Sequence, residues 1–199
     1  MLNERDTPLV GLVRSRDLAF QHGDAKKVAL AERPFPELVN LRGDPADEGW
    51  LRAVADIAGV APPTQPNTVT EGPDCLALWL GPDEWLLRSR EAVPEGGCLT
   101  HRLEEALAGR FFAVTDQSSA WSVMRLHGPR ATEVLGKGCP LDLHPRVLRL
   151  GQCAQSHYFR AGVLLRPLDA RSQDWEIIVR RSFADATARM LVDAMEEYL

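Results

Sequence analysis

The stretch Leu80-Gly81-Pro82-Asp83-Glu84-Trp85-Leu86-Leu87 places a glycine and a proline between two apolar segments. Glycine tolerates positive φ and proline fixes its own φ, so the two together favour a tight turn. The flanking residues, 75–80 and 84–88, are rich in Leu and Trp, which is typical of strands that pack on a core. The stretch therefore predicts a strand, a turn and a second strand.

Further strands and helices are expected on both sides of this turn. Strands are expected at residues 27–32, 38–41, 111–115, 121–127, 153–159, 162–168 and 175–179. Helices are expected at residues 47–58, which Gly59 ends, at 100–108, from Pro129 to about 135, and at 183–198. Because helices do not follow every strand, this order favours an α+β fold of antiparallel, β-rich lobes with packed helices over a doubly wound parallel sheet.

The helix expected at residues 183–198 has the clearest helical period in the chain. Its apolar stripe is expected to consist of Phe183, Thr187, Met190, Leu191, Ala194 and Tyr198. Charged residues lie opposite this stripe, so the stripe is expected to face the core.

Composition and charge argue against several classes of protein. Hydrophobic residues make up 45% of the 199-residue chain, so disorder is not expected, and the length suits one large domain or two small ones. Lys and Arg number 23 against 28 Asp and Glu, a net charge of -5 without a basic block, which argues against nucleic acid as a partner. No apolar run approaches the ~20 residues that cross a bilayer, so no membrane association is expected.

The cysteines Cys75, Cys98, Cys139 and Cys153 form no CxxC pair. Glu4 and Asp6 stand where the positive region of a signal peptide would be, so export is not expected. We therefore expect buried thiols rather than disulfides, and a cytoplasmic protein.

The chain is expected to divide near residue 25. Residues 1–25 read as an N-terminal arm, and residues 26–199 as one domain or as two lobes that share a core. Two interpretations of the arm stay open: a frayed terminus, or a segment that orders against a partner. The second is suggested by its apolar residues, Leu9, Val10, Leu12, Val13, Leu18 and Phe20.

Several further motifs follow the opening stretch in a fixed order. They are Val114-Thr115-Asp116-Gln117-Ser118-Ser119-Ala120-Trp121, Leu126-His127-Gly128-Pro129-Arg130-Ala131, Val134-Leu135, Cys139-Pro140-Leu141-Asp142-Leu143-His144-Pro145 and Cys153-Ala154-Gln155-Ser156. In this order and spacing, from about Lys26 to the last residue, the chain resembles the sarcosine oxidase gamma subunit family.

The resemblance implies a fold related to the aminomethyltransferase (glycine-cleavage T) superfamily. It also implies a non-catalytic gamma subunit of a heterotetrameric sarcosine oxidase, with alpha, beta and delta subunits as partners. FAD, FMN, NAD and zinc are then expected on those partners, and no catalytic, cofactor-binding or metal-binding residues in this chain. Such a complex oxidatively demethylates sarcosine to glycine, yields hydrogen peroxide and passes the one-carbon unit to tetrahydrofolate.

The chain departs from the catalytic relatives of that superfamily. It has no Gly-Gly-x-x-Asp-Asp run, which in the T-proteins places an acidic residue near the folate. The segment Gly136-Lys137-Gly138-Cys139 resembles the Lys-Gly-Cys motif of the folate-binding repair proteins, but Pro140, Leu141 and Asp142 replace the Gly-Gln-Glu that should follow. We interpret it as a coincidence. A glycine-rich phosphate loop is also absent.

Two groups of reactive side chains suggest chemistry, and each also has a structural explanation. Cys139, His144, Cys153 and His157 suggest zinc, but four residues of extended strand separate Cys153 from His157 by ~13 Å, so both reach one ion only if the strand bends sharply. Two buried thiols and two ordinary histidines are expected instead. Ser118 or Ser119 with Asp116 and His127 suggests a nucleophile. The serines occupy no Gly-x-Ser-x-Gly elbow, so Asp116 and the serines are expected to bond their own backbone in a turn.

Alternatives to an assembly subunit remain. A stand-alone folate-binding protein or one-carbon transferase would need a carboxylate for the pterin, and Asp116 or Glu176 could serve. A regulatory module for another amine-oxidising flavoenzyme is a third hypothesis. For a subunit, one or two of Trp79, Trp85 and Trp175 are candidates to face a partner, because Trp is enriched at interface hot spots.

Overall fold

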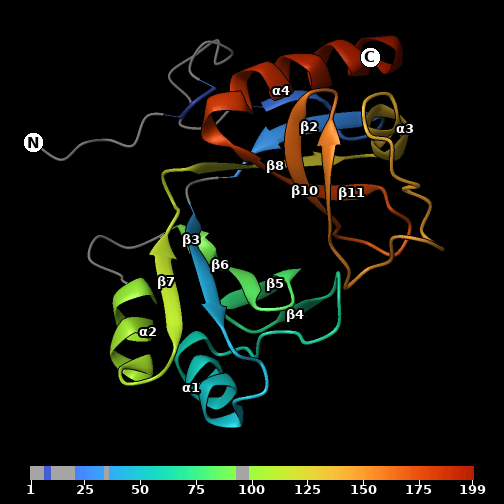
Figure 1. Cartoon of the computed structure of the whole chain (residues 1–199). Coiled ribbons are helices and arrows are strands. Elements are labelled where there is room, and N and C mark those ends of the chain that lie inside the picture. The colour runs from blue at the N-terminus through green and yellow to red at the C-terminus, as the bar shows by residue number, and fades with distance from the viewer. Residues whose placement is uncertain (1–6, 10–20, 34–35, 93–98) are drawn as a thin grey trace, which may run out of the picture. The chain divides into compact units, whose positions relative to one another are not determined.

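The computed structural model describes residues 7–9, 21–33, 36–92 and 99–199, and these fall into two compact units. Unit 1 comprises Met1–Arg33, Ala120–Leu150 and Ala154–Leu199. Unit 2 comprises Pro34–Ser119 and Gly151–Cys153. Each unit contains one antiparallel sheet with helices packed against it, and each has its own cluster of buried apolar side chains (Figure 1). The α+β class expected from the sequence is confirmed.

Unit 1 is built on a six-stranded sheet in the order β1-β2-β8-β11-β10-β9. The strands are β1 (Gln21–Asp24), β2 (Val28–Glu32), β8 (Trp121–His127), β9 (Ala154–Tyr158), β10 (Ala161–Pro167) and β11 (Asp174–Arg180). Every neighbouring pair is antiparallel. The sheet therefore joins the N-terminal strands to the C-terminal meander through β8.

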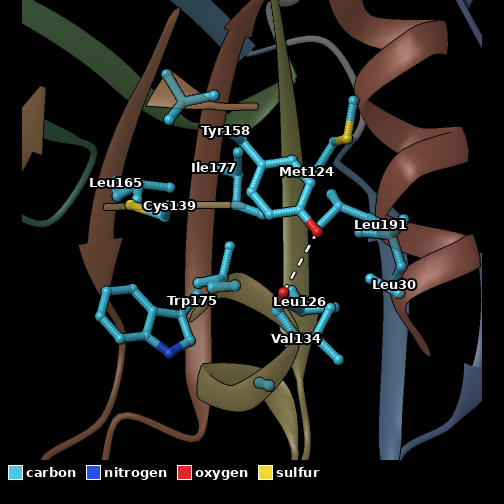
Figure 2. Packing of buried hydrophobic residues seen from close by; sticks show 14 of the residues in the cluster. Leu30, Met124, Leu126, Val134, Cys139, Tyr158, Leu165, Trp175, Ile177 and Leu191 are labelled. Atoms are coloured by element: carbon cyan, nitrogen blue, oxygen red, sulfur yellow. Dashed lines mark hydrogen bonds between the residues drawn. The ribbon is translucent and has the colours of Figure 1, made fainter. Parts of the chain in front are cut away.

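The core of unit 1 lies between this sheet and α4 (Arg181–Met195), with α3 (Ala131–Gly136) closing one end and a 3-10 turn, η1 (Glu196–Tyr198), following α4. Figure 2 shows the buried ring of Tyr158 among Ile177 and Leu191, with its hydroxyl donating to the Val134 carbonyl at 3.3 Å. This bond gives the one polar atom of the ring a partner inside an apolar core.

The face that α4 turns to the core differs from the expected stripe. Thr187, Leu191 and Ala194 are buried as expected, but Phe183 and Met190 are 46% and 38% exposed. The buried face is completed instead by Ala184, Ala188 and Met195. The buried face is therefore rotated by about one residue from the expected stripe, which leaves Phe183 and Met190 partly exposed.

Unit 2 is built on a five-stranded sheet in the order β4-β5-β6-β3-β7. Its strands are β3 (Pro36–Gly43), β4 (Val69–Glu71), β5 (Cys75–Gly81), β6 (Glu84–Ala92) and β7 (Phe112–Asp116), and its helices are α1 (Glu48–Ala58) and α2 (Leu99–Leu107). The predicted hairpin is β5 and β6, with Trp79 opposite Trp85 and Gly81 opposite Glu84 across a register shift. The Gly-Pro turn therefore forms where the sequence places it.

Helix α1 shows how local signals fix an element of unit 2. Asp47 caps its N-terminus, with Oδ1 accepting from the Trp50 amide at 3.0 Å. Gly59 ends it in the left-handed region at φ 67°, where glycine has no steric cost. The helix thereby buries Trp50 against Trp85, with the ring centroids 5.2 Å apart. The Trp85 indole donates to the Pro63 carbonyl at 2.7 Å.

Part of the expected N-terminal arm packs into unit 1. β1 pairs with β2, and the Leu9 side chain is fully buried in the unit 1 core. The Leu9 amide donates to Thr7 Oγ1 at 3.0 Å, and that hydroxyl donates to Glu32. Other apolar residues of the arm, Val10, Leu12, Val13, Leu18 and Phe20, lie outside the described residues. The domain boundary at residue 25 stays a prediction.

Candidate functional site

The Asp116 and Ser118 side chains form a local turn at the end of β7. Asp116 Oδ1 accepts from the Ser118 amide at 2.8 Å and from its hydroxyl at 2.5 Å. Ser118 Oγ in turn accepts from the Leu38 amide at 3.0 Å. This is the turn that the sequence predicts, and it fixes the chain after β7 to β3. Ser119 is exposed, and His127 belongs to unit 1.

The four candidate zinc ligands occupy different environments. Cys139 is buried in unit 1 with Sγ 3.7 Å from Ser156 Oγ, whereas His144 and His157 are exposed. Cys153 belongs to unit 2, where its Sγ lies 3.6 Å from the Trp79 carbonyl oxygen. Within the part of the chain that the structure describes, no three His, Cys, Asp or Glu residues are grouped so that they could hold a metal ion.

The segment Gly136-Lys137-Gly138-Cys139 serves the packing of unit 1. Lys137 Nζ donates to the Ala194 carbonyl at 2.6 Å and pairs with Glu197 at 2.7 Å, which places a positive charge at the C-terminal end of α4. A Cβ on Gly138 would stand 2.7 Å from ring atoms of both Tyr158 and Phe159. The lysine therefore holds the end of α4, and the glycine makes room for two aromatic rings.

Glu176, one of the two candidate pterin carboxylates, lies in a buried ion pair. Its Oε1 is 2.8 Å from Arg166 Nε on the neighbouring strand, and the two side chains are 2% and 7% exposed. Ile177 and Trp175, on either side of it in β11, belong to the core under α4. Because successive residues of a strand face opposite sides, Glu176 lies on the other face of the sheet.

More charged groups lie beside this pair, at the ends of β8 and β11. Arg125, opposite Glu176 on β8, forms two hydrogen bonds with Asp174, one of them 2.7 Å long. His127 lies opposite Asp174, and burial, followed by the nearby Arg125, lowers its pKa below the ordinary value. Sequence reasoning missed Arg125 and Arg166, because only the strand register pairs them with their acids.

Comparison with known proteins identifies the family of the chain. A model of the family described as "Sarcosine oxidase, gamma subunit family" matches residues 42–197. The chain belongs to the sarcosine oxidase gamma subunit family. A sarcosine oxidase subunit gamma from Corynebacterium sp. (strain P-1) is 37% identical over 179 residues, which cover 89% of this chain and 85% of the relative. The resemblance read from the ordered motifs is thus confirmed.

Solved structures agree with this gamma subunit assignment. A chain of the heterotetrameric sarcosine oxidase from Corynebacterium sp. U-96, in complex with pyrrole 2-carboxylate, matches with a TM-score of 0.78 and 35% identity over 89% of this chain and 88% of that one. The glycine cleavage aminomethyltransferase T of Bartonella henselae matches with a TM-score of 0.60 and 15% identity over 83% of this chain and 45% of that one. The second likeness concerns the fold alone, and it confirms the expected aminomethyltransferase-like architecture.

The tryptophans of this gamma-family chain are mostly internal. Trp85 and Trp175 are fully buried in the chain itself, which leaves the partly buried Trp79 as the one of the three candidates that can still face a partner. The exposed aromatic residue that stands out is Phe111, with 90% of its side chain in solvent. Composition alone could not find it, because the sequence shows a phenylalanine but not its exposure.

The described surface contains hollows, and one lies on each unit among those considered for a site. One, of about 430 Å³ on unit 1, is lined by Lys26, Lys27, Pro129, Arg130, Glu197 and Tyr198. The other, of about 580 Å³ on unit 2, is lined by Arg42, Gly43, Asp44, Pro45, Asp83, Phe111, Phe112 and Ala113. Neither is lined by Asp116 or Glu176. No helix in the described ranges is long and apolar enough to cross a membrane.

Proposed function

We propose that this chain is the gamma subunit of a heterotetrameric sarcosine oxidase, where it completes the assembly and carries no active site of its own. The observation that carries the proposal is the likeness, over 89% of the chain, to a chain of the heterotetrameric enzyme from Corynebacterium sp. U-96. The partners are the alpha, beta and delta subunits, which hold FAD, FMN, NAD and zinc. The complex demethylates sarcosine to glycine with release of hydrogen peroxide, and tetrahydrofolate accepts the one-carbon unit.

The carboxylates considered for the site are already bonded within the protein, which supports a non-catalytic role. Glu176 is neutralised by Arg166, and Asp174 by Arg125, across adjacent strands. Asp116 is used to close a turn. Carboxylates held in such contacts stabilise the fold, and a general acid or base instead needs a group directed at a substrate in a cleft.

A stand-alone folate-binding protein or one-carbon transferase is the alternative. The likeness to aminomethyltransferase T favours it only at the level of fold. A pterin-binding carboxylate would have to be Asp116 or Glu176, and both are engaged by the protein. Titration of the purified chain with tetrahydrofolate, followed by calorimetry, distinguishes the two: heat of tight 1:1 binding would favour the alternative.

The assembly role is tested by co-expressing this chain, tagged, with candidate flavoprotein partners and purifying through the tag. The proposal expects a yellow complex of several subunits that produces peroxide from sarcosine. Separating the subunits under denaturing conditions should leave no flavin on this chain. A colourless, tagged monomer would contradict the proposal.

A further inference from the structure

Phe111 lies in the connection between α2 and β7, and 90% of its side chain is exposed. Singly exposed apolar residues are common, but an aromatic ring so fully in water is a typical anchor of a protein interface when its surroundings can also bind. Here the ring borders the hollow of about 580 Å³ on unit 2. The surface next to Phe111 therefore combines an exposed aromatic ring, which a partner could enclose, with a hollow that a partner's side chains could fill.

The strand that follows Phe111 is an edge of its sheet. β7 pairs with β3, and no other described strand pairs with β7. The Gln117 amide donates to the Leu38 carbonyl at 2.7 Å, so residue 117 occupies a position that is hydrogen-bonded to β3. In an antiparallel pair every second residue occupies such a position, so Thr115 and Ala113 are also bonded to β3. The amides and carbonyls of Phe112 and Val114 consequently point away from β3.

Such an edge is a template for an added strand, because its outward N–H and C=O groups have the spacing of a sheet ladder. The side chains along it do not obstruct an approaching chain: Ala113 and Thr115 are small and exposed. The edge carries no Lys or Pro within Phe112–Asp116, the residues that commonly protect a free edge.

Charge around the surface indicates the kind of partner. The hollow is lined by Asp44 and Asp83 against one cation, Arg42, which pairs with Asp83. Asp116 is exposed at the other end of β7. If the β7 strands of two copies paired antiparallel with Val114 opposite Val114, Phe112 of each copy would lie opposite Asp116 of the other. Asp44 and Asp83, which line the hollow beside Phe112, would then lie near that Asp116. Like charges disfavour that pairing, so a different chain with basic side chains fits better.

We propose that Phe111 and the outer edge of β7 form the docking surface for another subunit of the hetero-oligomer. That subunit adds an extended segment to β7 as a sixth strand of the unit 2 sheet, encloses the Phe111 ring in an apolar pocket, and places a basic side chain near Asp44. The inference rests on the proposed function and names the surface through which it acts.

The test compares Phe111→Ser with a matched control, Phe183→Ser, in the co-expressed complex. Phe183 is also exposed, at 46%, but lies on α4 of unit 1. Both variants should unfold within a few degrees of the wild-type temperature as isolated chains, because neither ring is fully buried. We expect Phe111→Ser to weaken assembly by about tenfold or more, as loss of an aromatic hot spot does. Phe183→Ser should assemble normally.

Hydrogen exchange on the wild-type chain gives an independent readout of strand addition. The amides of Phe112 and Val114 should exchange rapidly in the isolated chain and slowly in the complex, because they gain partners only there. If the wild-type chain fails to assemble, the proposed function fails. If it assembles while Phe111→Ser assembles equally well and both amides exchange unchanged, this inference alone is overturned.

Discussion

Arg166 and Glu176 face each other across β10 and β11, with Nε and Oε1 2.8 Å apart and both side chains almost fully buried. Replacing the carboxylate removes the ion-pair partner of a guanidinium that is almost fully shielded from water. We expect Glu176→Gln to lower the free energy of unfolding by about 3–5 kcal/mol, measured by urea denaturation. The double variant Arg166→Met, Glu176→Leu should recover most of that loss, because it removes both charges.

The exposed pair of Arg189 and Asp185 on α4 is the control for this prediction, with side chains 54% and 44% exposed. Asp185→Asn should leave the unfolding midpoint unchanged, since surface pairs contribute little. Equal losses from Glu176→Gln and Asp185→Asn would show that burial of the Arg166 pair has no energetic role.

Two glycines of the Gly136-Lys137-Gly138 segment should respond oppositely to alanine. Gly138→Ala places a methyl group 2.7 Å from the Tyr158 and Phe159 rings, and we expect a loss of about 1–3 kcal/mol in unfolding free energy. Gly136 ends α3 with nothing within 4 Å of an added Cβ, so Gly136→Ala should be neutral or stabilise by up to about 1 kcal/mol. Equal effects would contradict the packing role assigned to Gly138.

Cys75 should make stability depend on alkaline pH. Burial raises the pKa of its thiol to about 11, whereas an unfolded cysteine ionises near its ordinary pKa of about 8.5. The buried thiol therefore contributes its full share to the free energy of unfolding below about pH 8.5, and this share is lost as the pH rises toward 11. Between pH 9 and 10.5, wild-type stability should fall faster than that of Cys75→Ala, by at most about 1.4 kcal/mol per pH unit. Parallel curves would contradict the assignment.

Elements with strong local signals were predictable from the sequence. α1 has a capping Asp47 and a terminating Gly59, and the β5–β6 hairpin has its Gly-Pro turn between Leu-rich strands. β1 was not predicted, because Gln21–Asp24 contains no apolar residue and forms a strand only through pairing with β2. β4 is three residues long and likewise depends on its neighbour.

Features that depend on tertiary packing could not be predicted from the sequence. The inward face of α4 is set by packing against the sheet, which buries Ala184 and Ala188 and leaves Phe183 and Met190 partly exposed. The pairing of Glu176 with Arg166 depends on strand register, to which two residues ten apart in the chain give no clue. The turn formed by Asp116 and Ser118 was predictable, because it closes within two residues.

Sarcosine-dependent peroxide production by the flavoprotein partners, purified with and without this chain, tests whether the chain is needed to assemble the oxidase. We expect a stable complex and peroxide production when the chain is present. Partners expressed alone should aggregate or fail to co-purify, and flavin should stay off this chain when the subunits of the complete complex are separated. Partners that assemble and turn over sarcosine equally well without the chain, while the chain remains a separate monomer, would contradict the assembly role.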